Sequence, residues 1–142
     1  MNIFILDESP TISAQLQCDK HVVKMCLESA QMLSTAHRML DGTVMKSPSK
    51  SGKRMVNRYV HPNPDMDAVL YNAVHFNHPC TVWTMQSTAN YRWHFEHFIA
   101  LCNEYTYRYG KVHKVERDGL MQLLKNEFPK NLPIAPFTEP TP

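Results

Sequence analysis

The sequence predicts an all-α protein, and three observations support that class. Apolar residues recur at helical spacing over two long segments, which end near residues 40 and 109. Ser9-Pro10 precedes the first segment and Gly110 follows the second, where helix caps belong. The chain has 142 residues, 43% of them hydrophobic and 20% charged, which suits one buried core. We therefore expect a single compact domain of three to four helices.

The first half of the chain predicts one long helix and one long loop. Residues 2–6 are apolar and form either a short strand or a plug across the core. A helix should follow from Pro10 to Leu40, and a second cap at Cys18-Asp19 would break it there. Residues 42–64 are rich in Ser, Pro and Gly and predict a loop, and loops of that length are usually functional or disordered.

The second half predicts three more helices. The first runs from Asp65 through His75, the next is long and extends from Thr81 to Tyr109, and a short one covers Leu120 to Phe128. The helix ending at Tyr109 is apolar over most of its circumference, so it should be central and pack against the first helix. Residues 129–142 contain five prolines and predict an extended tail beyond a helical domain of residues 1–128.

Composition excludes several classes of protein. No apolar run is long enough to span a membrane, and the N-terminus lacks the basic lead and apolar stretch of a secretory signal. The four cysteines include no C-x-x-C pair and are expected to be thiols. There is no G-x-G-x-x-G or Walker motif for phosphates. We expect a cytoplasmic protein without a membrane partner.

The first helix carries a polar stripe. His21, Lys24 and Glu28 fall within a strip of about 80° at 100° per residue, and Gln31 and Thr35 share it. A carboxylate beside a cation and an imidazole suits proton transfer or anion binding. The alternative is a solvated face with ordinary surface ion pairs.

The long helix that ends at Tyr109 has a second polar face. If the two faces meet, one cleft would contain His21, Lys24, Glu28, Asn90 and His97. Trp93 suits either a core position or stacking on a base. Arg108 suits either an internal ion pair with Glu104 or a role in this face.

Histidine spacing suggests a metal site only weakly. His75-x-x-His78, His94-x-x-His97 and Cys18-x-x-His21 each place two ligand types near one face. Neither an H-E-x-x-H nor an E-x-x-H motif completes any of these pairs. We predict no metal and no cofactor.

The region from 42 to 64 is the clearest electrostatic feature, although the net charge is only +2. It contains no acidic residue and five cations, namely Lys46, Lys50, Lys53, Arg54 and Arg58. Cations on a flexible segment suit contact with phosphates, independently of base sequence. The alternative is a solubilising surface loop.

The segment from Cys18 to Glu28 reads Cys-Asp-Lys-His-Val-Val-Lys-Met-Cys-Leu-Glu. It resembles the start of the first long helix in the pyrimidine-dimer DNA glycosylases, the phage endonuclease V family. There an Asp-x-His pattern precedes the catalytic glutamate, and Asp19, His21 and Glu28 match those positions. Residues 78–111 resemble the family's second block, through Glu104, Arg108 and Gly110-Lys111. The Cys-Asp-Lys-His-Val-Val-Lys-Met stretch is also similar to small uncharacterised phage proteins.

The resemblance implies a compact helical fold in which the N-terminus passes close to the first helix. Enzymes of that family flip a base opposite the lesion and attack the damaged nucleotide's sugar with the α-amino group of the chain. Strand cleavage then resolves the Schiff base. Glu28 would be the catalytic carboxylate, His21 a phosphate or sugar contact, and Met1 the source of the amine. Lys24 or Lys20 would supply positive charge or an alternative amine.

We therefore expect a small phage-type DNA repair enzyme, a DNA glycosylase/AP lyase acting on a damaged or modified base in the host cytoplasm. Its catalytic residues would be Glu28, His21, Lys24 and Met1. Nucleic acid would contact Lys46, Lys50, Lys53, Arg54, Arg58, Asn90, Trp93, His97, Arg108 and Lys111. Two alternatives stay open. One is an enzyme acting on free nucleotides or modified bases, and the other is a non-catalytic protein that binds a nucleotide, a nucleic acid or a host partner.

Overall fold

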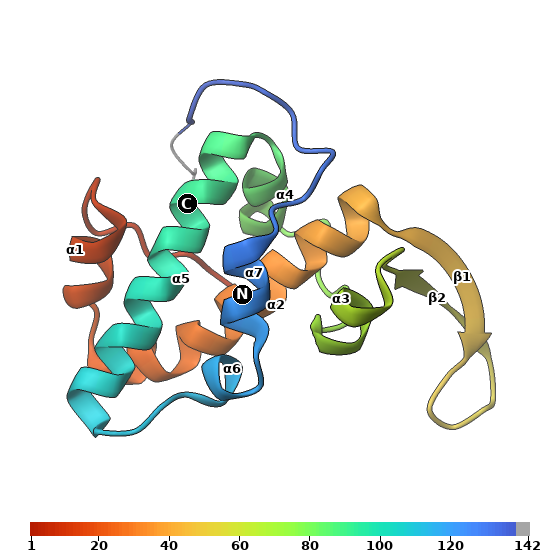
Figure 1. Ribbon diagram of the computed structural model, residues 1–142, viewed down its shortest axis with the longest axis horizontal. Coiled ribbons are helices and arrows are strands. Elements are labelled where there is room, and N and C mark those ends of the chain that lie inside the picture. Colours follow the sequence, from red (N-terminus) through yellow and green to blue (C-terminus); the bar gives the residue numbers. More distant parts are fainter. Residues whose placement is uncertain (139–142) are drawn as a thin grey trace.

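The computed structural model describes residues 1–138, which form seven helices and one two-stranded antiparallel sheet (Figure 1). The strands are β1 (Thr43–Pro48) and β2 (Met55–Val60). The helices are α1 (Pro10–Gln15), α2 (Asp19–Asp41), α3 (Pro64–Val69), α4 (Pro79–Met85), α5 (Thr88–Tyr109), α6 (Lys114–Arg117) and α7 (Leu120–Asn126). The all-α prediction with three to four helices is therefore wrong.

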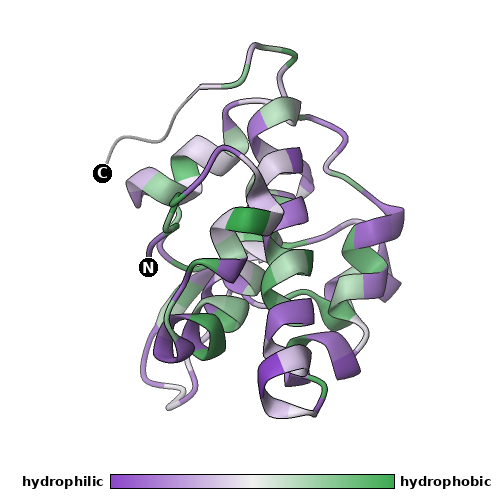
Figure 2. Ribbon diagram, turned by 90° about the vertical axis from the view of Figure 1, so that its left-hand side faces the viewer, coloured by the Kyte–Doolittle hydropathy of each residue, from purple (hydrophilic) through white to green (hydrophobic). Residues whose placement is uncertain are grey.

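The core lies between the two long helices, α2 and α5, which pack against each other. Leu33 of α2 and Phe98 of α5 are fully buried there, and Leu120 and Leu124 of α7 close the core from another side. Hydrophobic and hydrophilic residues interleave along the helices (Figure 2). Amphipathic helices around one shared core require this pattern.

The N-terminal segment behaves as a plug. Residues 2–6 form no strand, Ile3 is buried, and the Ser13 hydroxyl donates to the Phe4 carbonyl at 2.9 Å. We call residues 1–6 the N-terminal plug. The predicted cap at Ser9 is confirmed, because its side chain accepts from the Ile12 N–H at the start of α1. The predicted break at Cys18-Asp19 is also confirmed, since α2 begins at Asp19, but Cys18 makes no side-chain cap hydrogen bond.

The segment predicted as a loop over residues 42–64 contains a β-hairpin. β1 and β2 pair in register from Thr43 opposite Val60 to Pro48 opposite Met55. The turn between them closes through the Ser49 N–H, which donates to the Arg54 carbonyl at 2.8 Å, and uses Gly52 at φ +70°. Both faces of this hairpin are largely exposed, so the sequence lacks the apolar and polar alternation of a half-buried strand.

Two predicted helices are shorter than expected. The helix beginning near Asp65 ends at Val69, because α2 holds the chain beyond it through hydrogen bonds from Arg38 Nε to the Tyr71 carbonyl and from the Val74 N–H to Thr35 Oγ1. The long helix expected from Thr81 divides into α4 and α5. Ser87 separates them by capping the start of α5.

The described part of the tail, residues 129–138, is extended and lies against α4 and α5. The Thr88 N–H donates to the Pro133 carbonyl at 3.0 Å, and Trp83 Nε1 donates to the Thr138 carbonyl at 2.6 Å. Residues 139–142 of the predicted tail lie outside the described residues. None of the helices described here is both long and apolar enough to cross a membrane.

Candidate active site

The N-terminal plug places the α-amino group of Met1 beside Glu28 of α2. The amino nitrogen lies 3.2 Å from Glu28 Oε1. The Met1 side chain packs against a small cluster that includes Ile3 and Trp93 and is only 6% exposed, whereas Met1 as a whole is half-buried. The exposed part of this residue therefore lies on its main chain, which carries the amine.

Glu28 is a buried carboxylate whose two oxygens have different surroundings. Oε1 faces the amine, whereas Oε2 is buried and has no hydrogen-bond partner among the described residues. Lys24 Nζ lies 3.9 Å from Oε2, on a side chain that is 72% exposed. A buried carboxylate oxygen without a donor is costly in a purely structural setting.

Asn2 and Cys80 also belong to this site, and sequence reasoning missed both. Asn2 Oδ1 accepts from the Ile3 N–H at 3.0 Å and from the Cys80 thiol at 3.5 Å. Burial raises the pKa of the Cys80 thiol, and the charge of Glu28 acts in the same direction. The thiol therefore stays protonated and positions the plug. No motif links these distant residues, so the sequence carried no signal for them.

His21 supports the plug from outside. Its ring stacks on Phe4 with 4.3 Å between centroids and 10° between planes. Phe4 is in turn fixed by Ser13, as described above. His21 therefore packs on the outside of the plug, two helical turns before Glu28 on α2.

The polar residues predicted on α5 do not line an open cleft with Glu28, because Asn90 and His97 are buried. Asn90 Nδ2 donates to the Trp83 carbonyl at 2.9 Å, and Trp93 Nε1 donates to the Glu8 carbonyl at 2.9 Å. His97 Nδ1 donates to the Pro10 carbonyl at 3.0 Å. These side chains hold α4, the plug's continuation and α1 in place.

Arg108 forms the internal ion pair with Glu104 that was one of its two predicted roles, at 2.8 Å. It also contacts Asp19 at 3.0 Å and donates to the Gln15 carbonyl at 3.0 Å. Arg108 therefore ties the end of α1 and the start of α2 to α5. Lys111 lies exposed just beyond α5.

A groove of about 450 Å³ lies between α1 and α5, away from Glu28. Its lining includes Glu96, Glu104 and Asn103. Acidic walls are unsuited to nucleic acid, whose backbone is negatively charged.

The five predicted phosphate-binding cations all lie exposed on the hairpin or its turn, and none pairs with an acidic side chain in the part of the chain that the structure describes. Lys46 and Arg58 occupy opposite faces, since Lys46 pairs with Asn57 and Arg58 pairs with Met45. Val44, Met45 and Met55 are exposed beside them. The hairpin projects from the helical body (Figure 1).

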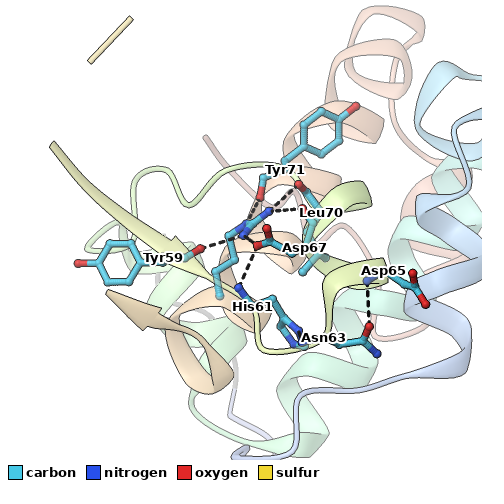
Figure 3. Close-up of polar contacts among 8 residues, drawn as sticks. Tyr59, His61, Asn63, Asp65, Asp67, Leu70 and Tyr71 are labelled. Atoms are coloured by element: carbon cyan, nitrogen blue, oxygen red, sulfur yellow. Dashed lines mark hydrogen bonds and ion pairs between the residues drawn. The ribbon is translucent and has the colours of Figure 1, made fainter. Parts of the chain in front are cut away.

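Arg38, near the end of α2, anchors the base of the hairpin. Its guanidinium forms an ion pair with Asp67 and donates to the carbonyls of Tyr59, Leu70 and Tyr71, which converge in Figure 3. Burial works to raise the pKa of Asp67, but the His61 N–H and Arg38 outweigh it and hold that pKa below its ordinary value. The Asp67 carboxylate is therefore a permanent partner of Arg38.

Members of each histidine pair considered as metal ligands make structural contacts. His78 Nδ1 caps α4 by accepting from the Cys80 N–H at 3.1 Å. His94 is buried between Thr84 at 2.8 Å and Ser29 at 3.0 Å. Three other potential ligands do converge within the described residues, namely His37, Asp41 and His61.

No family model, curated protein or solved structure matches this chain.

Proposed function

We propose that this protein is a DNA glycosylase with AP lyase activity, in which the α-amino group of Met1 is the nucleophile and Glu28 is the catalytic carboxylate. The observation that carries the proposal is the 3.2 Å separation between these two groups. The sequence resemblance assigns a role to each group separately, and the fold brings the two into contact. An α-amino group suits this role because it loses its proton more readily than a lysine amine does.

The chemistry needs one amine and one proton carrier. Glu28 takes a proton from the ammonium. The free amine then forms a bond to C1′ of the damaged nucleotide, and the base leaves with the electrons of the glycosidic bond and a proton. The sugar ring then opens to an iminium. Loss of a C2′ proton expels the 3′ phosphate and breaks the strand, and water hydrolyses the imine to regenerate the amine.

The two oxygens of Glu28 suit separate tasks in this sequence. Oε1 already faces the amine, so it is placed to take the proton. Oε2 is buried without a donor, so its negative charge would stabilise positive charge that develops on the sugar. Lys24 at the rim adds a positive charge for an adjacent phosphate.

The hairpin cations would hold the DNA backbone at a distance from this centre. Glu28 and the end of α2 are separated by roughly 20 Å along the helix, at 1.5 Å per residue. That corresponds to about six base pairs of duplex, at 3.4 Å per pair. The proposal therefore requires a duplex that extends beyond this length to contact the hairpin as well.

Single-turnover strand cleavage tests the proposal, with duplexes that contain either an abasic site or a cyclobutane dimer. Glu28→Gln keeps the side chain's shape but removes its charge, so we expect the rate to fall by about 10²-fold or more while binding is retained. Glu96→Gln, at an exposed position on α5, is the matched control and should cleave normally.

An unchanged rate in Glu28→Gln would contradict the catalytic role. Salt-dependent binding without any cleavage by the parent protein would favour the non-catalytic alternative. Turnover of nucleotides but not of duplexes would favour the enzyme on free nucleotides.

A further inference from the structure

Three potential metal ligands meet at the base of the hairpin. His37 and Asp41 lie one turn apart at the end of α2, and His61 directly follows β2. Their ligand atoms all lie within 4.8 Å of one another. His37 is fully buried, and its Nδ1 atom has no hydrogen-bond partner among the described residues. Most buried polar atoms in proteins are paired, so this nitrogen calls for an explanation.

We propose that His37, Asp41 and His61 bind one divalent transition-metal ion of the zinc class. Two imidazoles and one carboxylate are a ligand set that such ions accept, with a water molecule in the fourth position. An ion bound through Nδ1 of His37 would give that unpaired nitrogen a partner. The proposal does not depend on the glycosylase activity, since the site lies at the C-terminal end of α2, away from Glu28.

The surroundings of His37 favour the required tautomer. His37 Nε2 lies 2.8 Å from the hydroxyl of Tyr91, which is itself fully buried. If Nε2 carries the proton and donates to Tyr91, the lone pair of Nδ1 is free for a metal. Metal-bound histidines usually make this kind of second hydrogen bond.

Asp41 is oriented by its own hydrogen bonds and keeps one acceptor position free. Oδ1 accepts from the Asn131 backbone N–H at 3.1 Å and from its side-chain amide at 2.9 Å. Oδ2 accepts only from the Lys130 N–H, at 2.8 Å. A carboxylate oxygen has two lone pairs, so Oδ2 can also bind an ion.

His61 must exchange one partner for the metal. Its Nδ1 atom accepts from the Asn63 N–H at 3.1 Å, and a metal on either ring nitrogen breaks that bond. Binding through Nδ1 replaces the N–H directly, and binding through Nε2 moves the ring proton to Nδ1. The Asn63 amide therefore reports on metal binding. The donors also need to approach by less than about 1 Å to reach bond lengths near 2.1 Å.

A metal here would join the end of α2 to the end of β2. It would fix the direction in which the hairpin leaves the helical body, alongside the Arg38 contacts to Tyr59 and Asp67.

Titration of the purified protein with Co²⁺ and Zn²⁺ tests the proposal. We expect one ion per chain, cobalt absorption typical of tetrahedral or five-fold coordination without a thiolate charge-transfer band, and a shift of the Asn63 amide resonance. Asp41→Asn keeps the hydrogen-bond acceptor that faces Asn131, and His61→Ala removes a ligand. Each should weaken binding by about tenfold or more.

His75→Asn is the control, because it removes a histidine outside the cluster and asparagine tolerates the positive φ of 47° at that position. It should bind as the parent protein does. Circular dichroism and thermal melting of the metal-free variants separate lost binding from lost folding. Absence of stoichiometric binding, equal affinity in all variants, or a thiolate band from a cysteine would each overturn the proposal.

Discussion

Arg38 and Glu28 are both buried charged residues of α2, but their hydrogen-bonding groups are satisfied to different extents. Arg38 in the C-terminal half uses all five of its N–H groups, on Asp67 and on the carbonyls of Tyr59, Asp67, Leu70 and Tyr71. Glu28 in the N-terminal half has one oxygen beside the Met1 amine and one without a donor. A fully satisfied network stabilises a fold, whereas an unsatisfied buried group costs stability and is common where proteins bind or react. The difference accords with a structural role for the Arg38 network and with the catalytic role proposed for Glu28.

Removing Arg38 tests the structural role of its hydrogen-bond network and should have the largest effect on stability. Arg38→Ala leaves the Asp67 carboxylate without its cation and removes a donor from four backbone carbonyls, so we expect a loss of about 3–5 kcal/mol in the free energy of unfolding. Urea denaturation measures this. The exposed Arg117 provides the control, since Arg117→Ala should cost no more than about 0.5 kcal/mol. Equal effects of the two substitutions would remove the contrast between the Arg38 network and Glu28.

Acid should lower the free energy of unfolding through His94, which contacts Ser29 next to Glu28. This imidazole is fully buried between Thr84 and Ser29, and burial lowers its pKa to about 3, with the neighbouring His97 acting in the same direction. The unfolded chain takes up the proton near pH 6.5, whereas the folded chain does not, so stability falls as the pH drops below 6.5. The linked loss from His94 is about 2 kcal/mol at pH 5.

His94→Gln cannot titrate and checks the origin of that loss. Its free energy of unfolding should fall less between pH 7 and pH 5 than that of the parent protein, whatever its stability at neutral pH. Parallel pH profiles for the two proteins would show that His94 does not contribute.

Neutralising one hairpin cation should have the smallest effect and should leave catalysis untouched. Lys46→Gln or Arg58→Gln removes one phosphate contact, so the slope of log affinity against log salt should fall by about 0.9 on duplex DNA. The cleavage rate of bound substrate should not change. Lys125→Gln, at an exposed position on α7, is the control. A salt slope unaffected by either hairpin substitution would assign the hairpin a role other than DNA binding.

The sequence predicts most helix boundaries near the site because local signals set them. Ser9-Pro10 and Gly110 cap helices by their own chemistry, and helical spacing places Lys24 and Glu28 on one strip. The contact between Met1 and Glu28 could be expected only through the resemblance, because no local rule connects an extended plug to the middle of α2.

The errors arise where tertiary contacts or exposure override local signals. The hairpin has two exposed faces, so its strands lack the alternation that identifies a half-buried strand. Two groups assemble only when the hairpin folds back on α2, namely the Arg38 network and the cluster of His37, Asp41 and His61. Folding of the hairpin brings the end of α2 and the end of β2 together. Spacing within one helix cannot reveal such groups.

Borohydride trapping on a duplex with an abasic site tests the role of the Met1 amine most directly. Intact mass measurement first establishes that the purified protein carries a free α-amino group at Met1. Reduction during the reaction should then yield one covalent protein–DNA adduct, which peptide mapping places on the Met1 nitrogen, and an acetylated N-terminus should yield none. An adduct on Lys20 or Lys24, or no adduct with a cleavable substrate, would contradict the assignment of Met1 and Glu28 as the catalytic pair.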